Sequence, residues 1–274
     1  MPFDIADFLT EDRIVHINEW NSGAHSNKEF IRVLDEIMNL INIKLSTLPS
    51  TKKISEYNPY ILIEYQLNIA SHSPIVNDNS GYIKKLIKIV LIGSDKRMGQ
   101  VSDIYLNGGT YLDNLYFIVR IGINNDKTIK EIQSSIDSLK PMMGHELVHV
   151  FQNLYNNYQK TQAYINRLNK NAPIDDSGEK HTFNNPDYWS SRHEIEAYIT
   201  QINGELKNIK KDNKDITFKS AILKSQGWRD FMTHVPLNKR EKIQRKMLSK
   251  IAHYWTSQLK GKLNEMRKLN YREY

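Results

Sequence analysis

The pattern of apolar positions divides the chain into a first part with one helix and several strands and a second part that is mainly helical. Between residues 27 and 48, the apolar positions recur at helical spacing and predict one buried stripe. That stripe consists of Phe30, Val33, Leu34, Ile37, Ile41 and Leu45. Residues 60–69 alternate with period two, which predicts a strand with one apolar face. Residues 82–92 fit a helix by spacing and a strand by their β-branched composition, so both remain open.

The next segments predict a hairpin followed by helices. Residues 104–106 and 115–121 are strand-like and flank the turn sequence that begins with Asn107-Gly108-Gly109. After residue 126 we expect a helix over 128–139, and Pro141 suits the first turn of a second helix that runs to about 157. A polar loop over 171–190 then precedes a helix over 191–210. The sequence therefore predicts an α+β fold, with an antiparallel or mixed sheet and a helix before the later helices.

The apolar segment 142–151 contains the motif H-E-x-x-H. On a helix, His145 and His149 leave the same face one turn apart, so both imidazoles can bind one metal ion. Glu146 is rotated off that face and is better placed to hold a metal-bound water. A core helix whose histidines merely find hydrogen-bond partners is the alternative, but it leaves a buried carboxylate unexplained. The motif therefore favours a metal site.

A catalytic zinc ion takes three protein ligands and a water, so a third ligand must come from elsewhere in the chain. The chain has no cysteine, and no third histidine follows His149 at the spacing of the metzincins. The best candidate is the segment 191–199, which is typical of the start of a helix: Ser190 or Ser191 can cap it, and Glu194 follows Ser191 by three residues.

H-E-x-x-H followed by a later helix with E-x-x-A and a polar residue resembles the gluzincin metallopeptidases. In that family a glutamate completes the zinc site, and the match assigns this role to Glu194, with Ala197 and Tyr198 in the trailing positions. The resemblance covers roughly residues 129–209. It implies a zincin-like domain over residues 1–212, with metal-binding helices over about 141–157 and 191–210.

Other ligands remain open within the same segment. Glu196 lies about 200° from Glu194 around a helix, so only one of the two can face the metal. His193 is a further possibility, although a residue beside a ligand more often contacts substrate or the ligands themselves. The oxyanion that forms during hydrolysis needs a donor besides zinc, and Tyr188, Tyr198 and His193 are the candidates.

The resemblance implies a zinc-dependent metalloendopeptidase with one Zn²⁺ ion and a peptide or protein substrate. Glu146 would activate the zinc-bound water as a general base and then protonate the leaving amine. The resemblance also implies that the strand 115–121 is an edge strand that binds extended peptide, and an interior strand is the alternative. A metal-stabilised structural or virion-associated protein without turnover is a second possible function.

The C-terminal segment is strongly basic. Residues 239–274 contain 11 Lys or Arg and 3 Glu, a net charge of +8, whereas the whole chain carries +7. Its apolar residues recur near helical spacing, which predicts an amphipathic helical extension over 213–274, packed on the same domain. The basic face is either simply solvated or binds an anionic partner, namely nucleic acid, an acidic protein or an acidic membrane. A nucleic-acid-binding protein is therefore the third possible function.

Composition places few further limits. A hydrophobic content of 39% with 25% charged residues is ordinary for a globular protein. The sequence contains no run of 18 apolar residues, so it predicts no transmembrane segment. The first residues lack the pattern of a signal peptide, and the absence of cysteine excludes disulfides, so we expect a cytoplasmic location. The abundance of Lys, Ile and Asn suggests an AT-rich genome, which would suit a bacterium, a phage or another virus; for a viral source, the host cytoplasm or the virion is expected.

Overall fold

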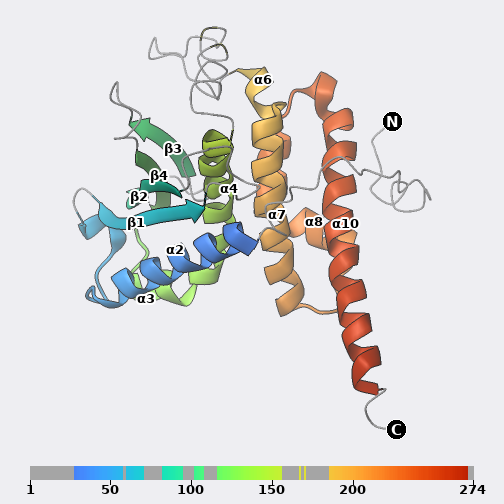
Figure 1. The fold of residues 1–274 in the computed structure, drawn as a ribbon, viewed down its shortest axis with the longest axis horizontal. Helices are drawn as coiled ribbons and strands as arrows, with labels where there is room; N and C mark the ends of the chain where they lie inside the picture. The colour runs from blue at the N-terminus through green and yellow to red at the C-terminus, as the bar shows by residue number, and fades with distance from the viewer. Residues whose placement is uncertain are drawn as a thin grey trace. The chain divides into compact units, whose positions relative to one another are not determined.

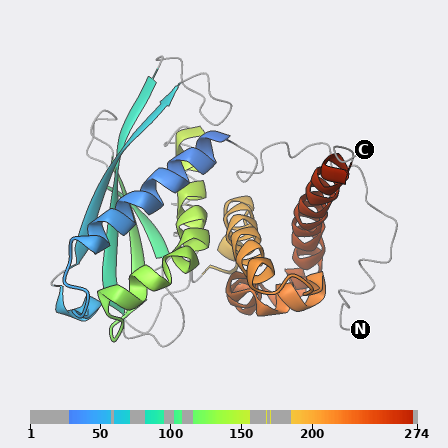
Figure 2. The same cartoon turned by 90° about the horizontal axis from the view of Figure 1, so that it is seen from below.

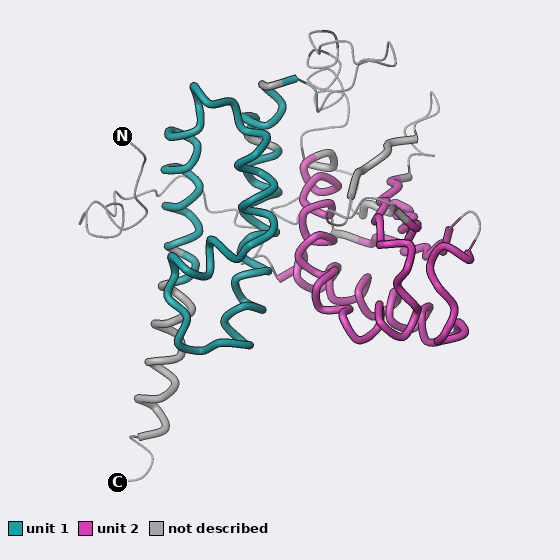
Figure 3. Tube along the Cα trace, turned by 180° about the vertical axis from the view of Figure 1, so that it is seen from behind, with its two compact units in different colours: residues 1–21, 183–274 teal, residues 22–182 magenta. Residues whose placement is uncertain are grey.

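The computed structural model describes residues 28–57, 60–70, 82–94, 102–107, 116–155, 167, 170 and 185–270 (Figure 1). Many side chains inside these ranges are not described, including His193, all of those in 102–107 and those from residue 256 onward. The chain forms two compact units, unit 1 with residues 1–21 and 183–274, and unit 2 with residues 22–182 (Figure 3). The domains predicted from the sequence, 1–212 and 213–274, divide the chain at a different place from these two units, and that division stays a prediction.

Unit 2 contains a mixed sheet, which together with the helices gives the expected α+β class. Its strands are β1 (Ile61–Ala70), β2 (Tyr82–Ser94), β3 (Ser102–Asn107) and β4 (Tyr116–Asn124), in the order β1-β2-β4-β3. The pairs β1–β2 and β3–β4 are antiparallel, whereas β2 and β4 are parallel. The segment 82–92, for which the sequence allowed a helix or a strand, is therefore a strand. Its β-branched residues lie in β2, which pairs with β1 on one side and β4 on the other.

Of the two alternatives for the predicted strand 115–121, the interior one is confirmed and the edge strand is wrong. The segment forms β4, which pairs with both β2 and β3 and has no open side for strand addition. Phe117, Val119 and Ile121 are buried, as an interior strand requires. Within the described part of the sheet, the edge strands are β1 and β3.

Helix α2 (Lys28–Ser46) buries the predicted stripe, including Val33, Ile37 and Ile41. It contacts β1 and α4 (Ile136–Tyr155), and α4 also contacts β3 and β4 (Figure 2). The short helix η2 (Ile54–Glu56) contacts β2. The helix α4, which carries the H-E-x-x-H motif, is thus held by the sheet and by α2.

The predicted boundary before the motif helix was wrong by about one turn. Helix α3 (Ile129–Ser134) begins with the capping box of Thr128 and Glu131 and ends early at Ser135. The hydroxyl of Ser135 donates to the carbonyl oxygen of Glu131 at 2.8 Å, which stabilises this early end. Helix α4 then starts at Ile136, so Pro141 lies inside the helix instead of in its first turn. The described part of α4 ends at Tyr155, and residues 156 and 157 lie outside the description.

Unit 1 consists of helices in its described part. They are α6 (Pro186–Trp189), α7 (Arg192–Asp212), α8 (Phe218–Lys224), α9 (Gln226–His234) and α10 (Leu237–Asn270). Of the two predicted caps, Ser190 and Ser191, it is Ser191 that caps α7, because its side chain accepts a hydrogen bond from the N–H of Glu194 at 3.2 Å. Ile202, Phe231 and Met247 belong to one buried cluster that joins α7 to α9 and α10. The basic C-terminal segment therefore packs against α7, and Ile243, Met247 and Ile251 form its buried face as far as the side chains are described. Among the described residues, no helix is both long enough and apolar enough to cross a membrane.

A carboxylate of α7 fixes the start of α9. Glu205 accepts hydrogen bonds from the hydroxyl of Ser225 at 2.6 Å, from the N–H of Gly227 at 3.0 Å and from the amide of Gln201 at 2.9 Å. Ser225 is itself the cap of α9 and accepts from the N–H of Trp228. A Cβ atom at Gly227 would lie 2.9 Å from Nε2 of Gln201, so a larger residue there would displace the Gln201 side chain. This network holds α7 against α9.

We expect Glu205→Ala to lower the free energy of unfolding by about 2 kcal/mol, because it removes charge-assisted hydrogen bonds at a partly buried helix start. Glu241→Ala is the matched control, since Glu241 forms an exposed pair with Arg245 on one helix and should contribute about 0.3–0.5 kcal/mol. Urea unfolding followed by circular dichroism measures both changes. Equal losses in the two variants would contradict the role of Glu205.

Candidate metal centre

Helix α4 brings its two motif histidines together on one face. The Nε2 atoms of His145 and His149 lie 3.3 Å apart, and the ring centroids are 5.0 Å apart with the rings inclined at 73°. His145 is buried and His149 is half-buried. Both rings therefore direct the same nitrogen toward one point, as their four-residue spacing predicts.

This separation fits a shared metal ion. Two nitrogens at roughly 2.0–2.1 Å from a tetrahedral zinc ion must be about 3.4 Å apart. The 3.3 Å between the Nε2 atoms matches that requirement. Imidazole nitrogens are ligands that zinc prefers, so both the spacing and the donor type pass the test.

Glu146 is deeply buried in an apolar stretch of the same helix. Its side chain is 2% exposed, and its Oε1 atom lies 3.9 Å from Nε2 of His145. The neighbouring apolar residues of the motif are buried as predicted: Met142, Met143, Leu147, Val148, Val150 and Phe151. A carboxylate at this depth is costly unless polar or charged groups compensate it. The carboxylate of Glu146 therefore lies near the point at which the Nε2 atoms of the two histidines meet.

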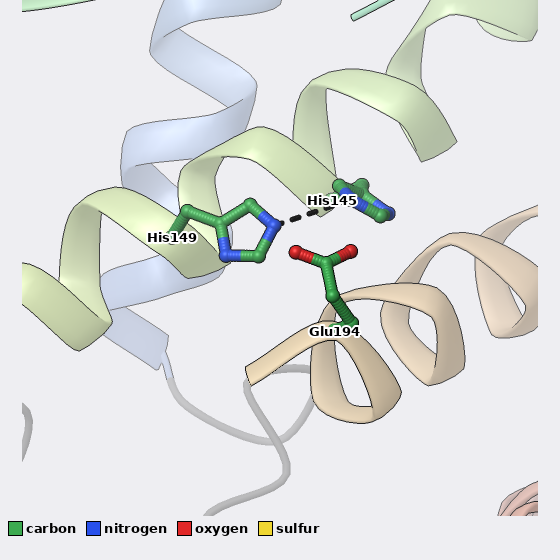
Figure 4. Close-up of side chains that lie close together, drawn as sticks. All are labelled: His145, His149 and Glu194. Atoms are coloured by element: carbon green, nitrogen blue, oxygen red, sulfur yellow. Dashed lines mark hydrogen bonds between the residues drawn. The ribbon is translucent and has the colours of Figure 1, made fainter. Parts of the chain in front are cut away.

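Glu194 supplies the third possible ligand. One ligand atom from each of His145, His149 and Glu194 lies within 4.8 Å of the other two. Figure 4 shows the carboxylate of Glu194 turned toward the ring nitrogens of both histidines. Glu194 is buried in the first turn of α7, where the cap by Ser191 fixes its backbone. This set of two imidazoles and one carboxylate could hold a metal ion.

The other residues predicted for the site are not part of this group of ligand atoms, as far as they are described. Glu196 is half-buried and, among the described residues, is not part of the group of ligand atoms. The ring of Tyr198 packs on Phe231 at 4.7 Å between centroids, and the ring of Tyr188 contacts Trp189 at 5.2 Å. The side chain of His193 lies outside the described residues. The roles expected of these residues stay predictions.

Sequence reasoning missed one residue at the centre. Oε1 of Gln152 lies 3.0 Å from Nδ1 of His149, on the side of the ring away from Nε2. The available signal was an amide three residues after the second motif histidine, a spacing that places two side chains next to each other on a helix.

Comparison of the chain with protein-family models, with curated proteins and with solved structures finds no match in any of the three. The geometry of the centre therefore carries the functional argument.

Substituting the two glutamates of α7 tests which of them binds metal. We expect Glu194→Gln to weaken zinc binding by more than about 100-fold, beyond the 10–100-fold typical of residues that only contact a ligand. Glu196→Gln is the matched control and should bind zinc as the unmodified protein does. Competition with a chromophoric chelator measures both affinities. Loss of zinc in the Glu196 variant alone would reverse the assignment.

Proposed function

We propose that the chain is a zinc metallopeptidase with a zincin-like catalytic domain. The observation that carries this proposal is the pair of Nε2 atoms of His145 and His149, 3.3 Å apart, with the carboxylate of Glu194 in the same group. Such a donor set is typical of catalytic zinc, which keeps one position for water or substrate. The H-E-x-x-H motif and its glutamate-bearing partner helix support the same conclusion.

His145, His149 and Glu194 would hold the ion. When bound, zinc supplies a Lewis acid that polarises the substrate carbonyl and lowers the pKa of water. The chain's own contribution begins with burial, because Met143, Leu147 and Val150 exclude bulk water from the helix around the ligands. A low local dielectric strengthens each electrostatic interaction with the reacting groups.

Glu146 is the proposed general base. Its carboxylate would take a proton from the attacking water, whose oxygen then forms a bond to the carbonyl carbon of the peptide. The same proton would pass from Glu146 to the amine nitrogen as the carbon–nitrogen bond breaks. The distance of 3.9 Å between Oε1 of Glu146 and Nε2 of His145 supports this role.

The interior place of β4 changes where an extended peptide would bind. Helix α4 contacts β3, which is the edge strand on that side of the described sheet. Backbone groups on the open side of an edge strand can pair with an extended chain. We therefore assign the predicted strand addition to β3.

A second, compatible function is suggested by the surface of α10. Lys242, Arg245 and Lys246 are exposed on the helix that buries Ile243 and Met247. A row of cations on a firmly packed helix suits an anionic partner, and a strong salt dependence of binding to DNA or RNA would identify nucleic acid. This surface does not include any residue of the metal centre.

The substitution Glu146→Gln tests the mechanism. It keeps the size of the side chain but cannot accept a proton, so we expect hydrolysis of labelled casein to fall by about 10²–10⁴-fold. Zinc content and the circular dichroism spectrum should be unchanged. Glu241→Gln, on the exposed surface of α10, should retain full activity that a chelator removes. Undiminished hydrolysis by the Glu146 variant would rule out the proposed mechanism.

A further inference from the structure

We infer that Gln152 is a positioning residue that holds His149 in the tautomer able to bind metal through Nε2. The inference rests on the proposed zinc site, and it assigns a role to a side chain outside the H-E-x-x-H motif. It follows from the contact of 3.0 Å between Oε1 of Gln152 and Nδ1 of His149.

The chemistry of the contact selects one tautomer. A neutral imidazole carries a single N–H, on either Nδ1 or Nε2, and an amide oxygen can only accept a hydrogen bond. With Oε1 of Gln152 facing the ring, the proton lies on Nδ1 of His149, which donates it to Gln152. The lone pair is then on Nε2, the atom that lies 3.3 Å from Nε2 of His145. A proton on Nε2 would instead occupy the position of the metal.

The helix makes this arrangement possible. Side chains on an α-helix lean toward its N-terminus, so Gln152 reaches back over the turn that carries His149. Both residues are half-buried, where a hydrogen bond competes less with water than it would on the surface. The neighbours Val148, Val150 and Phe151 are apolar and cannot orient a ring nitrogen.

An uncharged partner also suits the surroundings. A glutamine accepts the hydrogen bond without placing another negative charge near Glu146, so the carboxylates of the centre gain no further like-charge repulsion. Partners of this kind commonly change metal affinity by 10–100-fold, because a ligand with the wrong tautomer or ring orientation must rearrange before it binds. Substitution of Gln152 should therefore lower the affinity for metal and have little effect on the stability of the fold.

The first test measures the tautomer in the metal-free full chain. Two-dimensional ¹H–¹⁵N NMR through multiple bonds distinguishes a protonated ring nitrogen from one with a lone pair. We expect His149 to be protonated on Nδ1 in the unmodified protein and to shift toward the Nε2-protonated form in Gln152→Met, which keeps the length but not the acceptor. A ring that is protonated on Nε2 in the unmodified protein would overturn the inference.

The second test measures zinc affinity by chelator competition. We expect Gln152→Met to bind zinc about 10–100-fold more weakly than the unmodified protein, and Gln152→Glu, which keeps an acceptor oxygen, to bind zinc more tightly than Gln152→Met. Gln244→Met is the matched control, because Gln244 is a half-buried glutamine of α10. Unchanged affinity in Gln152→Met would overturn the inference. Absence of zinc binding by the unmodified protein would instead contradict the proposed function, since the tautomer is measured without metal.

Discussion

The placement of two imidazoles and a buried carboxylate on one largely apolar helix is the constraint on which the proposed site depends. Helix α4 is buried on nearly every side of the motif, and Glu146 is only 2% exposed. Placing ionisable groups at such depth costs several kcal/mol unless partners or a metal ion compensate them. The convergence of the two Nε2 atoms to 3.3 Å is an arrangement that a shared cation stabilises well.

Within each unit, the helix that carries candidate ligands is fixed by packing inside that unit. In unit 2, α4 contacts α2 and the sheet, so the rings of His145 and His149 project from a rigid backbone. In unit 1, α7 is held by the buried cluster with α8, α9 and α10 and by the hydrogen bonds of Glu205. Functional geometry built on packed helices is more exact than geometry built on loops.

The sequence was informative where one local rule decides the outcome. Helical periodicity predicted α2, and the cap at Ser191 predicted the start of α7, because both signals depend on near neighbours. The end of α3 at Ser135 was missed because a side-chain hydrogen bond decides it. Whether β4 is an edge or an interior strand stayed open because long-range strand pairing decides it. The role of Gln152 was missed because a motif names the ligands and not the groups that orient them.

X-ray absorption at the zinc edge of the purified full chain tests the central claim most directly. The account predicts one zinc ion per chain, bound by nitrogen and oxygen atoms at about 2.0–2.1 Å, with the outer-shell scattering of two imidazoles. A chain that takes up no stoichiometric zinc, or a zinc ion whose spectrum lacks imidazole scattering, would contradict it.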